Sequence, residues 1–237
     1  MAVLSWSGCR NVRDLGGLPT VDGRTTRARV LVRADTLSCL DGDGLTALEA
    51  YGVTRIVDLR AVEETVDPPH PWAGRDGYVS VPWIDIDREA ERDPEIGRSL
   101  AELYRGSLDR NVRQVASAVR AFLTAPSGPV VVHCAAGKDR TGMLVALLLE
   151  VAGVPREVVL DDYAVSSELL GIAALLERMS EQERAAIEEY VWSRPETLRT
   201  ALAHLDRRYG GPPAYLRDAC GLEESEVDAV RERLVGD

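Results

Sequence analysis

A cysteine and an arginine are separated by five residues in the segment 133–142, which reads His-Cys-Ala-Ala-Gly-Lys-Asp-Arg-Thr-Gly. A cysteine thiolate is a strong nucleophile, so Cys134 is the candidate to attack a phosphoryl group. The planar guanidinium of Arg140 can hold two phosphoryl oxygens at once, which a lysine cannot do. Thr141 can direct its hydroxyl at the sulfur. These residue types predict phosphate ester hydrolysis through a cysteinyl phosphate that water then cleaves, with no metal required.

The elements expected on either side position this loop. Residues 129–132 form a short β-branched run, and residues 141–152 carry leucine and valine at helical spacing, which predicts strand, tight loop and helix. Such a loop turns successive backbone N–H groups toward one point, with the positive end of the helix dipole behind them. This environment favours the thiolate form of Cys134. The phosphate-binding residues predicted from it are Ala135, Ala136, Gly137, Lys138 and Thr141.

A lone cysteine at the end of a buried strand is more often an inert packing residue than a nucleophile. Here Arg140 at a fixed spacing, Gly137 within the loop, and the flanking strand and helix each add an independent requirement. Their combination therefore favours catalysis over packing.

The composition is that of an ordinary globular protein, with 45% hydrophobic and 28% charged residues. We expect a single domain over residues 1–237 that acts as a monomer. A cytoplasmic location is expected because the longest apolar run is too short to span a membrane and the first residues lack a signal-peptide pattern. Export by a route without a recognisable signal is left open. No cofactor or metal is expected, since the four cysteines form neither a disulfide framework nor a zinc motif.

The net charge of −11 argues against a nucleic-acid partner, because a phosphate backbone would meet a repulsive surface. A phosphorylated substrate must therefore be met by local positive charge. Lys138 is the only lysine among the 28 basic residues, and it lies inside the loop. The simplest interpretation of this scarcity is a coding bias toward arginine together with chance. A flexible ammonium at this position can nevertheless reach a second anionic group, which adds phosphoinositides or doubly phosphorylated substrates to the hypothesis.

The rest of the chain predicts an α/β fold in its first part and a helical second part. An extended segment is expected at residues 11–20, followed by a turn at Asp22-Gly23, and strands are expected at residues 29–33, 54–60 and 78–81. Helices are expected at residues 45–51, 95–104, 111–123, 196–209 and 225–234. Residues 63–73 are rich in proline and predict a surface loop. Ser180 and Glu183 have the spacing of a capping box.

Four motifs together resemble the mycobacterial-type tyrosine phosphatase B family. They are the cysteine loop and the segments 11–17 (Asn-Val-Arg-Asp-Leu-Gly-Gly), 57–60 (Val-Asp-Leu-Arg) and 162–166 (Asp-Tyr-Ala-Val-Ser). The resemblance covers essentially the whole chain and implies a bacterial cysteine-dependent phosphatase. It implies a central, mainly parallel sheet of four or five strands flanked by helices, with a helical lid at about 169–209. Related enzymes accept phosphotyrosine, sometimes phosphoserine or phosphothreonine, and in some members phosphoinositides.

Three carboxylates are candidates for the general acid that protonates the leaving oxygen. Asp139 ranks first because it directly precedes Arg140, an arrangement that resembles the myotubularin and Sac inositide phosphatases; its alternative role is to stabilise the loop. Asp58, at the end of a predicted strand, is a second acid or a residue that orients Arg60. Asp85 ranks third. Supporting hydrogen bonds and packing are expected from His133, Tyr163 and Ser166.

Two alternatives come from other functional classes. The first is a non-catalytic module that recognises a phosphorylated protein or lipid. The second is a sulfur- or arsenate-handling enzyme, which usually needs a different loop length or a resolving cysteine. Cys9, Cys39 or Cys220 serves that purpose only if it folds near Cys134.

Overall fold

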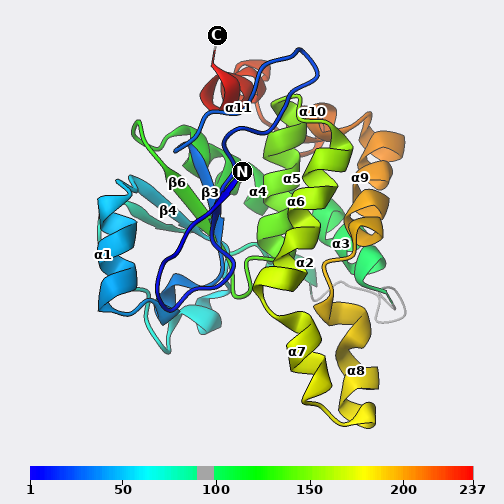
Figure 1. The fold of residues 1–237 in the computed structure, drawn as a ribbon. Coiled ribbons are helices and arrows are strands. Elements are labelled where there is room, and N and C mark those ends of the chain that lie inside the picture. Colours follow the sequence, from blue (N-terminus) through cyan, green and yellow to red (C-terminus); the bar gives the residue numbers. More distant parts are fainter. Residues whose placement is uncertain (90–98, 237) are drawn as a thin grey trace.

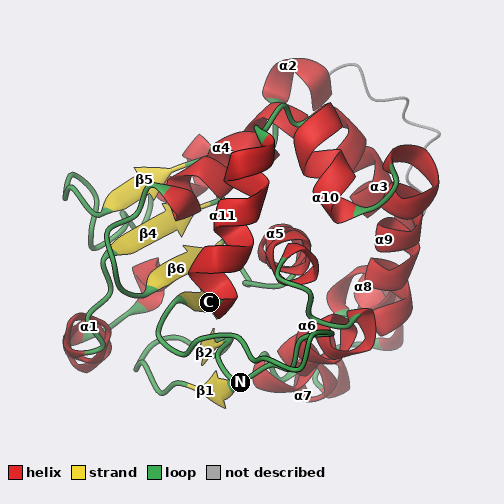
Figure 2. Cartoon of the chain, turned by 90° about the horizontal axis from the view of Figure 1, so that it is seen from above, coloured by secondary structure: helices red, strands yellow, loops and turns green. Residues whose placement is uncertain are grey.

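The computed structural model describes residues 1–89 and 99–236. Within these residues the chain forms a sheet of six strands in the order β1-β2-β3-β6-β4-β5, with helices on both faces (Figures 1 and 2). Four neighbouring strands run parallel, namely β3 (Leu31–Ala34), β6 (Val130–His133), β4 (Arg55–Asp58) and β5 (Tyr78–Ser80). The predicted α/β class with a mainly parallel sheet is confirmed.

Two very short strands extend this sheet beyond the predicted four or five. β1 (Ala2–Val3) pairs with β2 (Arg13–Asp14), and β2 pairs with β3, both antiparallel. β2 lies in the segment predicted to be extended, residues 11–20, but each strand contains only two residues, which is too few for its limits to be read from the sequence. Their pairing holds the 11–17 segment beside β3 and therefore close to the cysteine loop.

Alternate residues of the central strand face two separate cores. Val130 and Val132 of β6 belong to the larger core, to which helices α4 (Val112–Leu123), α5 (Asp139–Val151) and α11 (Glu224–Val235) contribute. Val131 faces the smaller core, where Leu48 of α1 (Gly42–Ala50) packs. Because both faces are covered, β6 is apolar along its length apart from His133.

Helix α5 lies in the centre of the larger core and carries the cysteine loop at its N-terminus. Every residue from 141 to 149 is buried. Helix α6 (Arg156–Leu169) packs against α5, and α9 (Pro195–Tyr209) packs against both α6 and α3 (Leu100–Arg110). The helix predicted at 95–104 is α3, which starts after the N-cap Ser99 and continues to Arg110; residues 95–98 lie outside the described part.

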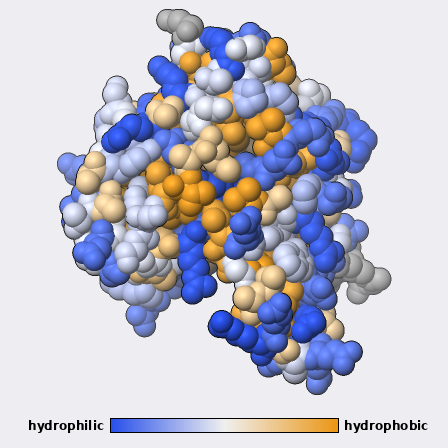
Figure 3. Space-filling view, viewed as in Figure 1, coloured by the Kyte–Doolittle hydropathy of each residue, from blue (hydrophilic) through white to orange (hydrophobic). Residues whose placement is uncertain are grey.

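Helices α7 (Ile172–Glu177) and α8 (Glu181–Val191) form a hairpin that projects from the body of the protein (Figure 1). The predicted capping box between Ser180 and Glu183 is present at the start of α8. No residue of α8 is buried. Figure 3 shows hydrophobic residues gathered near the middle of this face, whereas hydrophilic residues cover the outer end of the hairpin.

The remaining short elements are the 3-10 helices Leu37–Cys39 and Val62–Thr65, α2 (Ile86–Glu89), α10 (Pro212–Ala214) and a π-helical turn at Tyr215–Ala219. The helix Val62–Thr65 falls in the segment that we predicted as a surface loop. In the described part of the chain, no helix is long and apolar enough to cross a membrane.

Candidate active site

The cysteine loop lies between β6 and α5, at the carboxyl end of the parallel strands, where open α/β sheets bind ligands. Cys134 is buried, with 1% of its surface exposed, and α5 begins five residues later at Asp139. Gly137 has a φ of +64°, and a Cβ there would lie 2.2 Å from the carbonyl oxygen of Ala34. The predicted need for glycine at this position is therefore confirmed on two grounds, backbone conformation and space.

The carbonyl groups of the loop are bound on its outer side. Asn11 Nδ2 donates to the carbonyls of Ala136 at 2.9 Å and Gly137 at 3.2 Å, and Arg33 Nη2 donates to the same Gly137 carbonyl at 2.6 Å. In a planar trans peptide the N–H points away from the C=O. Holding these carbonyls against the scaffold therefore turns the following amides toward the opposite side, as an anion-binding loop requires.

A buried ion cluster supports Arg33 from beneath. Asp162 accepts hydrogen bonds from Arg13 Nε at 2.7 Å and from Arg33 Nη1 at 2.6 Å. Burial lowers the pKa of Arg13 to about 10, whereas the two arginines outweigh the effect of burial on Asp162 and lower its pKa. Arg13 also donates to Ser166 Oγ at 2.9 Å, which confirms the supporting role predicted for Ser166. Two buried cations with one anion leave net positive charge beneath the loop.

Arg140 is held by a carboxylate that is absent from the predicted site. Its two terminal nitrogens pair with both oxygens of Glu64, with Nη2 at 2.8 Å from Oε1. The amide of Ala61 donates to the same carboxylate, and the pairing with Arg140 lowers the pKa of Glu64. This end-on contact uses one N–H of each terminal nitrogen and leaves the Nε side of the guanidinium for a phosphate. Glu64 lies in the proline-rich segment, so its local sequence carries no signal of this role.

Asp58 is fully buried and paired with Arg60, whose Nη2 lies 2.7 Å from Oδ2. Tyr78 donates its hydroxyl to the same oxygen at 2.9 Å. Burial acts to raise the pKa of Asp58, but Arg60 and His133 outweigh it and lower the pKa to about 2. An ionised, enclosed carboxylate orients Arg60 and is unsuited to proton donation. Arg60 in turn donates to the carbonyl of Glu64 at 3.1 Å, so Asp58 acts on the partner of Arg140.

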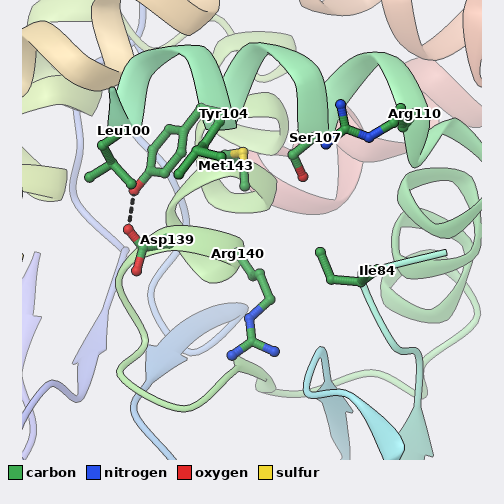
Figure 4. Close-up of a pocket in the computed structure, with 9 residues that line it drawn as sticks. Ile84, Leu100, Tyr104, Ser107, Arg110, Asp139, Arg140 and Met143 are labelled. Atoms are coloured by element: carbon green, nitrogen blue, oxygen red, sulfur yellow. Dashed lines mark hydrogen bonds between the residues drawn. The ribbon is translucent and has the colours of Figure 1, made fainter. Parts of the chain in front are cut away.

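Asp139 borders a cavity of about 270 Å³ beside Arg140 (Figure 4). The hydroxyl of Tyr104 donates to its Oδ1, and Lys138 Nζ lies 3.3 Å from the same oxygen. Its side chain keeps 37% of its surface exposed. The apolar residues that line the cavity are Ile84, Leu100, Leu103 and Met143. Asp139 is thus both anchored and accessible, unlike Asp58.

Asp85 lies at another hollow and not at the cavity beside Arg140. Its amide donates to Asn111 Oδ1 at 2.8 Å, and its Oδ1 accepts from the amide of Arg88 at 3.4 Å, at the start of α2. These contacts assign Asp85 to the local structure around α2.

In the structure, the side chains of Lys138 and Thr141 are not placed for the contacts predicted for them, with a substrate and with the Cys134 sulfur. The lysine is 4% exposed, and its ammonium donates to the carbonyls of Tyr190 and of Val191, the latter at 3.2 Å. The lysine therefore joins the loop to the end of α8. The Thr141 hydroxyl is buried and has no hydrogen-bond partner among the described residues, so it does not donate to the Cys134 sulfur here.

The environments of His133 and of the three other cysteines give them no direct part in the chemistry. His133 Nδ1 lies 3.2 Å from the carbonyl oxygen of Cys134, and burial lowers the pKa of His133 to about 4, so the ring is neutral. Burial raises the pKa of the Cys9 thiol, and that of Cys220 to about 12. Cys39 is exposed, and no disulfide is formed by these free cysteines in the described part.

A parallel α/β sheet with a Cys-x5-Arg loop between strand and helix defines a cysteine-dependent phosphatase. The chain belongs to the tyrosine phosphatase family, whose model it matches over residues 4–236. It is 31% identical to the triple specificity protein phosphatase PtpB of Mycobacterium tuberculosis, with the whole of both chains covered. A tyrosine-protein phosphatase of Nostoc commune is 28% identical, covering 87% of this chain and 74% of the relative. The predicted family and enzyme class are confirmed, in preference to a non-catalytic module or a sulfur- or arsenate-handling enzyme.

Proposed function

We propose that Cys134 is the nucleophile and Arg140 the phosphate-binding side chain of this protein-tyrosine phosphatase. The observation that carries the assignment is the set of loop carbonyls held outward by Asn11 and Arg33, because it directs the intervening amides toward one side of the loop. The buried cations beneath the loop favour the negative charge of both thiolate and phosphate.

The reaction takes place in two steps. The Cys134 sulfur attacks phosphorus as the ester P–O bond breaks, and the proton of Asp139 passes to the leaving oxygen. Water then attacks the cysteinyl phosphate, with Asp139 accepting a proton, and inorganic phosphate and the thiolate are released. Throughout, the loop amides and Arg140 hold the phosphoryl oxygens and stabilise their charge.

Replacing Asp139 by asparagine should slow substrates in proportion to how poorly they leave. General acid catalysis contributes about 10²- to 10⁴-fold, so we expect losses in that range for phenyl phosphate and phosphotyrosine peptides. The loss for p-nitrophenyl phosphate should be much smaller, because its leaving group needs little protonation. The measurement is kcat across a series of substituted phenyl phosphates. Asp85→Asn is the matched control, and an equal loss on good and poor leaving groups would remove Asp139 from this role.

The cavity beside Asp139 supports an aromatic phosphate ester as substrate. A volume of about 270 Å³ with apolar walls fits the ring of phosphotyrosine, with its leaving oxygen toward Asp139. We extend the proposal to phosphoserine, phosphothreonine and phosphoinositide substrates, and the similarity to a protein phosphatase named for triple specificity supports a range wider than phosphotyrosine. Release of phosphate from a panel of these substrates by the purified protein tests the range. Release from none of them would overturn the proposal.

Lys138 is proposed to contact a second phosphate when the substrate carries one. Its ammonium is bound by the carbonyls of Tyr190 and Val191, so this contact requires it to leave the end of α8. Lys138→Ala should lower kcat/KM about tenfold more for phosphoinositides and doubly phosphorylated peptides than for singly phosphorylated ones, as expected for one lost charged hydrogen bond. The same substrate panel measures it. A uniform change on all substrates would show that Lys138 is not a specificity element.

The hairpin α7–α8 is proposed as the lid. Of the expected range of about 169–209, α9 packs on α3 and α6 and belongs to the body, whereas the hairpin projects beside the loop and contacts Lys138. We further propose that the enzyme is a single domain and acts as a monomer in the cytoplasm on phosphorylated protein or phosphoinositide. Its net charge of −11 argues against nucleic acid as a partner.

A further inference from the structure

Two buried tyrosines connect Asp139 with the protein interior. Tyr104 of α3 donates its hydroxyl to Asp139 Oδ1, as the dashed line in Figure 4 shows. The same Tyr104 oxygen lies 2.7 Å from the hydroxyl of Tyr163 on α6. A phenol has a single O–H proton, and Tyr104 gives its proton to the carboxylate. The hydrogen bonds therefore run from Tyr163 to Tyr104 and from Tyr104 to Asp139.

Packing fixes both rings in this arrangement. Tyr104 is 2% and Tyr163 is 1% exposed, and the rings meet edge to face with centroids 6.3 Å apart. Tyr163 also lies against Gly142, where a Cβ would come within 2.9 Å of a ring carbon. Burial raises the pKa of both phenols above the usual range, so both remain protonated donors. The pair is thus preorganised to donate toward Asp139.

We propose that Tyr104 is a positioning residue for Asp139 and that Tyr163 supports it. This inference rests on the proposed function, in which Asp139 is the proton donor. Both the Tyr104 hydroxyl and the Lys138 ammonium contact the same oxygen, Oδ1. Oδ2 is therefore the oxygen that faces the leaving group and carries the proton.

The hydrogen bonds from Tyr163 to Tyr104 and from Tyr104 to Asp139 also stabilise the transition state more than the ground state. As the S–P bond forms and the P–O bond breaks, the electron pair of the broken bond stays on the leaving oxygen, which takes the proton from Asp139. The carboxyl group thereby gains negative charge. A hydrogen bond to a carboxylate is stronger than one to a neutral carboxylic acid, so the Tyr104 contact strengthens as the proton leaves. An interaction of this kind raises kcat and leaves KM nearly unchanged.

Tyr104→Phe tests the inference because it removes the hydroxyl and keeps the ring. We expect kcat for phenyl phosphate to fall about tenfold, the effect of one hydrogen bond to a charged group, with a much smaller loss for p-nitrophenyl phosphate. Tyr163→Phe should show the same dependence on the leaving group with a smaller loss. In an Asp139→Asn background, Tyr104→Phe should cause no further loss, since Tyr104 acts through Asp139.

Tyr215→Phe is the matched control for a purely structural effect. Tyr215 is also fully buried, and its hydroxyl donates to the carbonyl of Leu108 on the same helix α3 at 2.7 Å. Its loss should lower the thermal unfolding midpoint about as much as Tyr104→Phe does, without any dependence on the leaving group. All variants are assayed at a temperature at which thermal unfolding shows them to be folded.

The outcomes separate the inference from the proposed function. If Tyr104→Phe slows both substrates equally, or lowers the activity of Asp139→Asn further, Tyr104 has only a structural role and the inference is wrong while the assignment of Asp139 stands. If Asp139→Asn itself shows no dependence on the leaving group, the proposed proton donor is wrong and the positioning role is overturned with it.

Discussion

Replacing Cys134 by serine is expected to lower kcat by at least about 10⁴-fold, since loss of a nucleophile in other hydrolases costs up to the order of 10⁶-fold. A serine hydroxyl is far less acidic than a thiol. The adjacent His133 is a weak base, because burial lowers its pKa to about 4, and its Nδ1 lies at the carbonyl oxygen of Cys134. The measurement is phosphate release from p-nitrophenyl phosphate under saturating conditions.

Two controls accompany the serine variant. Cys220→Ser changes another partly buried cysteine, which follows the π-helical turn Tyr215–Ala219, and should keep the kcat of the parent protein. The Cys134→Ser protein should still bind inorganic phosphate, because the loop amides and Arg140 are retained. Activity above about one hundredth of the parent value would show that another group acts as the nucleophile, since nucleophile loss costs far more than that.

Arg140→Lys is expected to lower kcat/KM by about 10³-fold, which corresponds to about 4 kcal/mol of transition-state stabilisation. Lysine keeps the charge but loses the planar fork that holds two oxygens. It also loses the two-point contact with Glu64, so the cation is no longer fixed beside the loop. Steady-state kinetics with a phosphotyrosine peptide measure the effect.

The control for the arginine variant is Arg120→Lys. Arg120 makes a similar two-point contact with Glu226, with distances of 2.8 and 3.0 Å, but on the surface between α4 and α11. Its replacement should leave kcat/KM near the parent value. A loss at Arg140 no larger than the loss at Arg120 would contradict the phosphate-binding role.

The strand, loop and helix around Cys134 were predictable because their signals are local. A run of β-branched residues, a glycine and a leucine-rich helix each appear within a short window, and β6 and α5 form there. The α/β class follows from the same kind of pattern. The strand β1, and the limits of β2 within the extended segment at residues 11–20, were not predictable, because two-residue strands are defined only by their pairing partners.

The partners of the loop could not be predicted from local sequence. Glu64 lies 76 positions from Arg140 and Tyr104 lies 35 from Asp139, so only tertiary packing brings each pair together. Local sequence also does not show which of the candidate carboxylates is buried. Asp58 lies at the end of a predicted strand and Asp139 in the loop before a predicted helix, and burial alone distinguishes the enclosed ion pair from the accessible side chain.

Because distant residues hold the loop carbonyls, we expect catalytic activity only when the whole chain has folded. Asn11 is 126 positions from Gly137, and Arg13 is 149 positions from Asp162, so the loop acquires its shape only when distant parts of the chain have come together. Contacts of such sequence separation cost chain entropy to close, which makes them slow to form. A chain whose four parallel strands and helices are intact but whose first segment, with β1 and β2, has detached would keep Cys134 and lose the aligned amides. The segment 133–142 is therefore not sufficient for function by itself. If it were inserted between another strand and helix without these distant partners, it would keep the residues of a phosphatase and lack the anion-binding site.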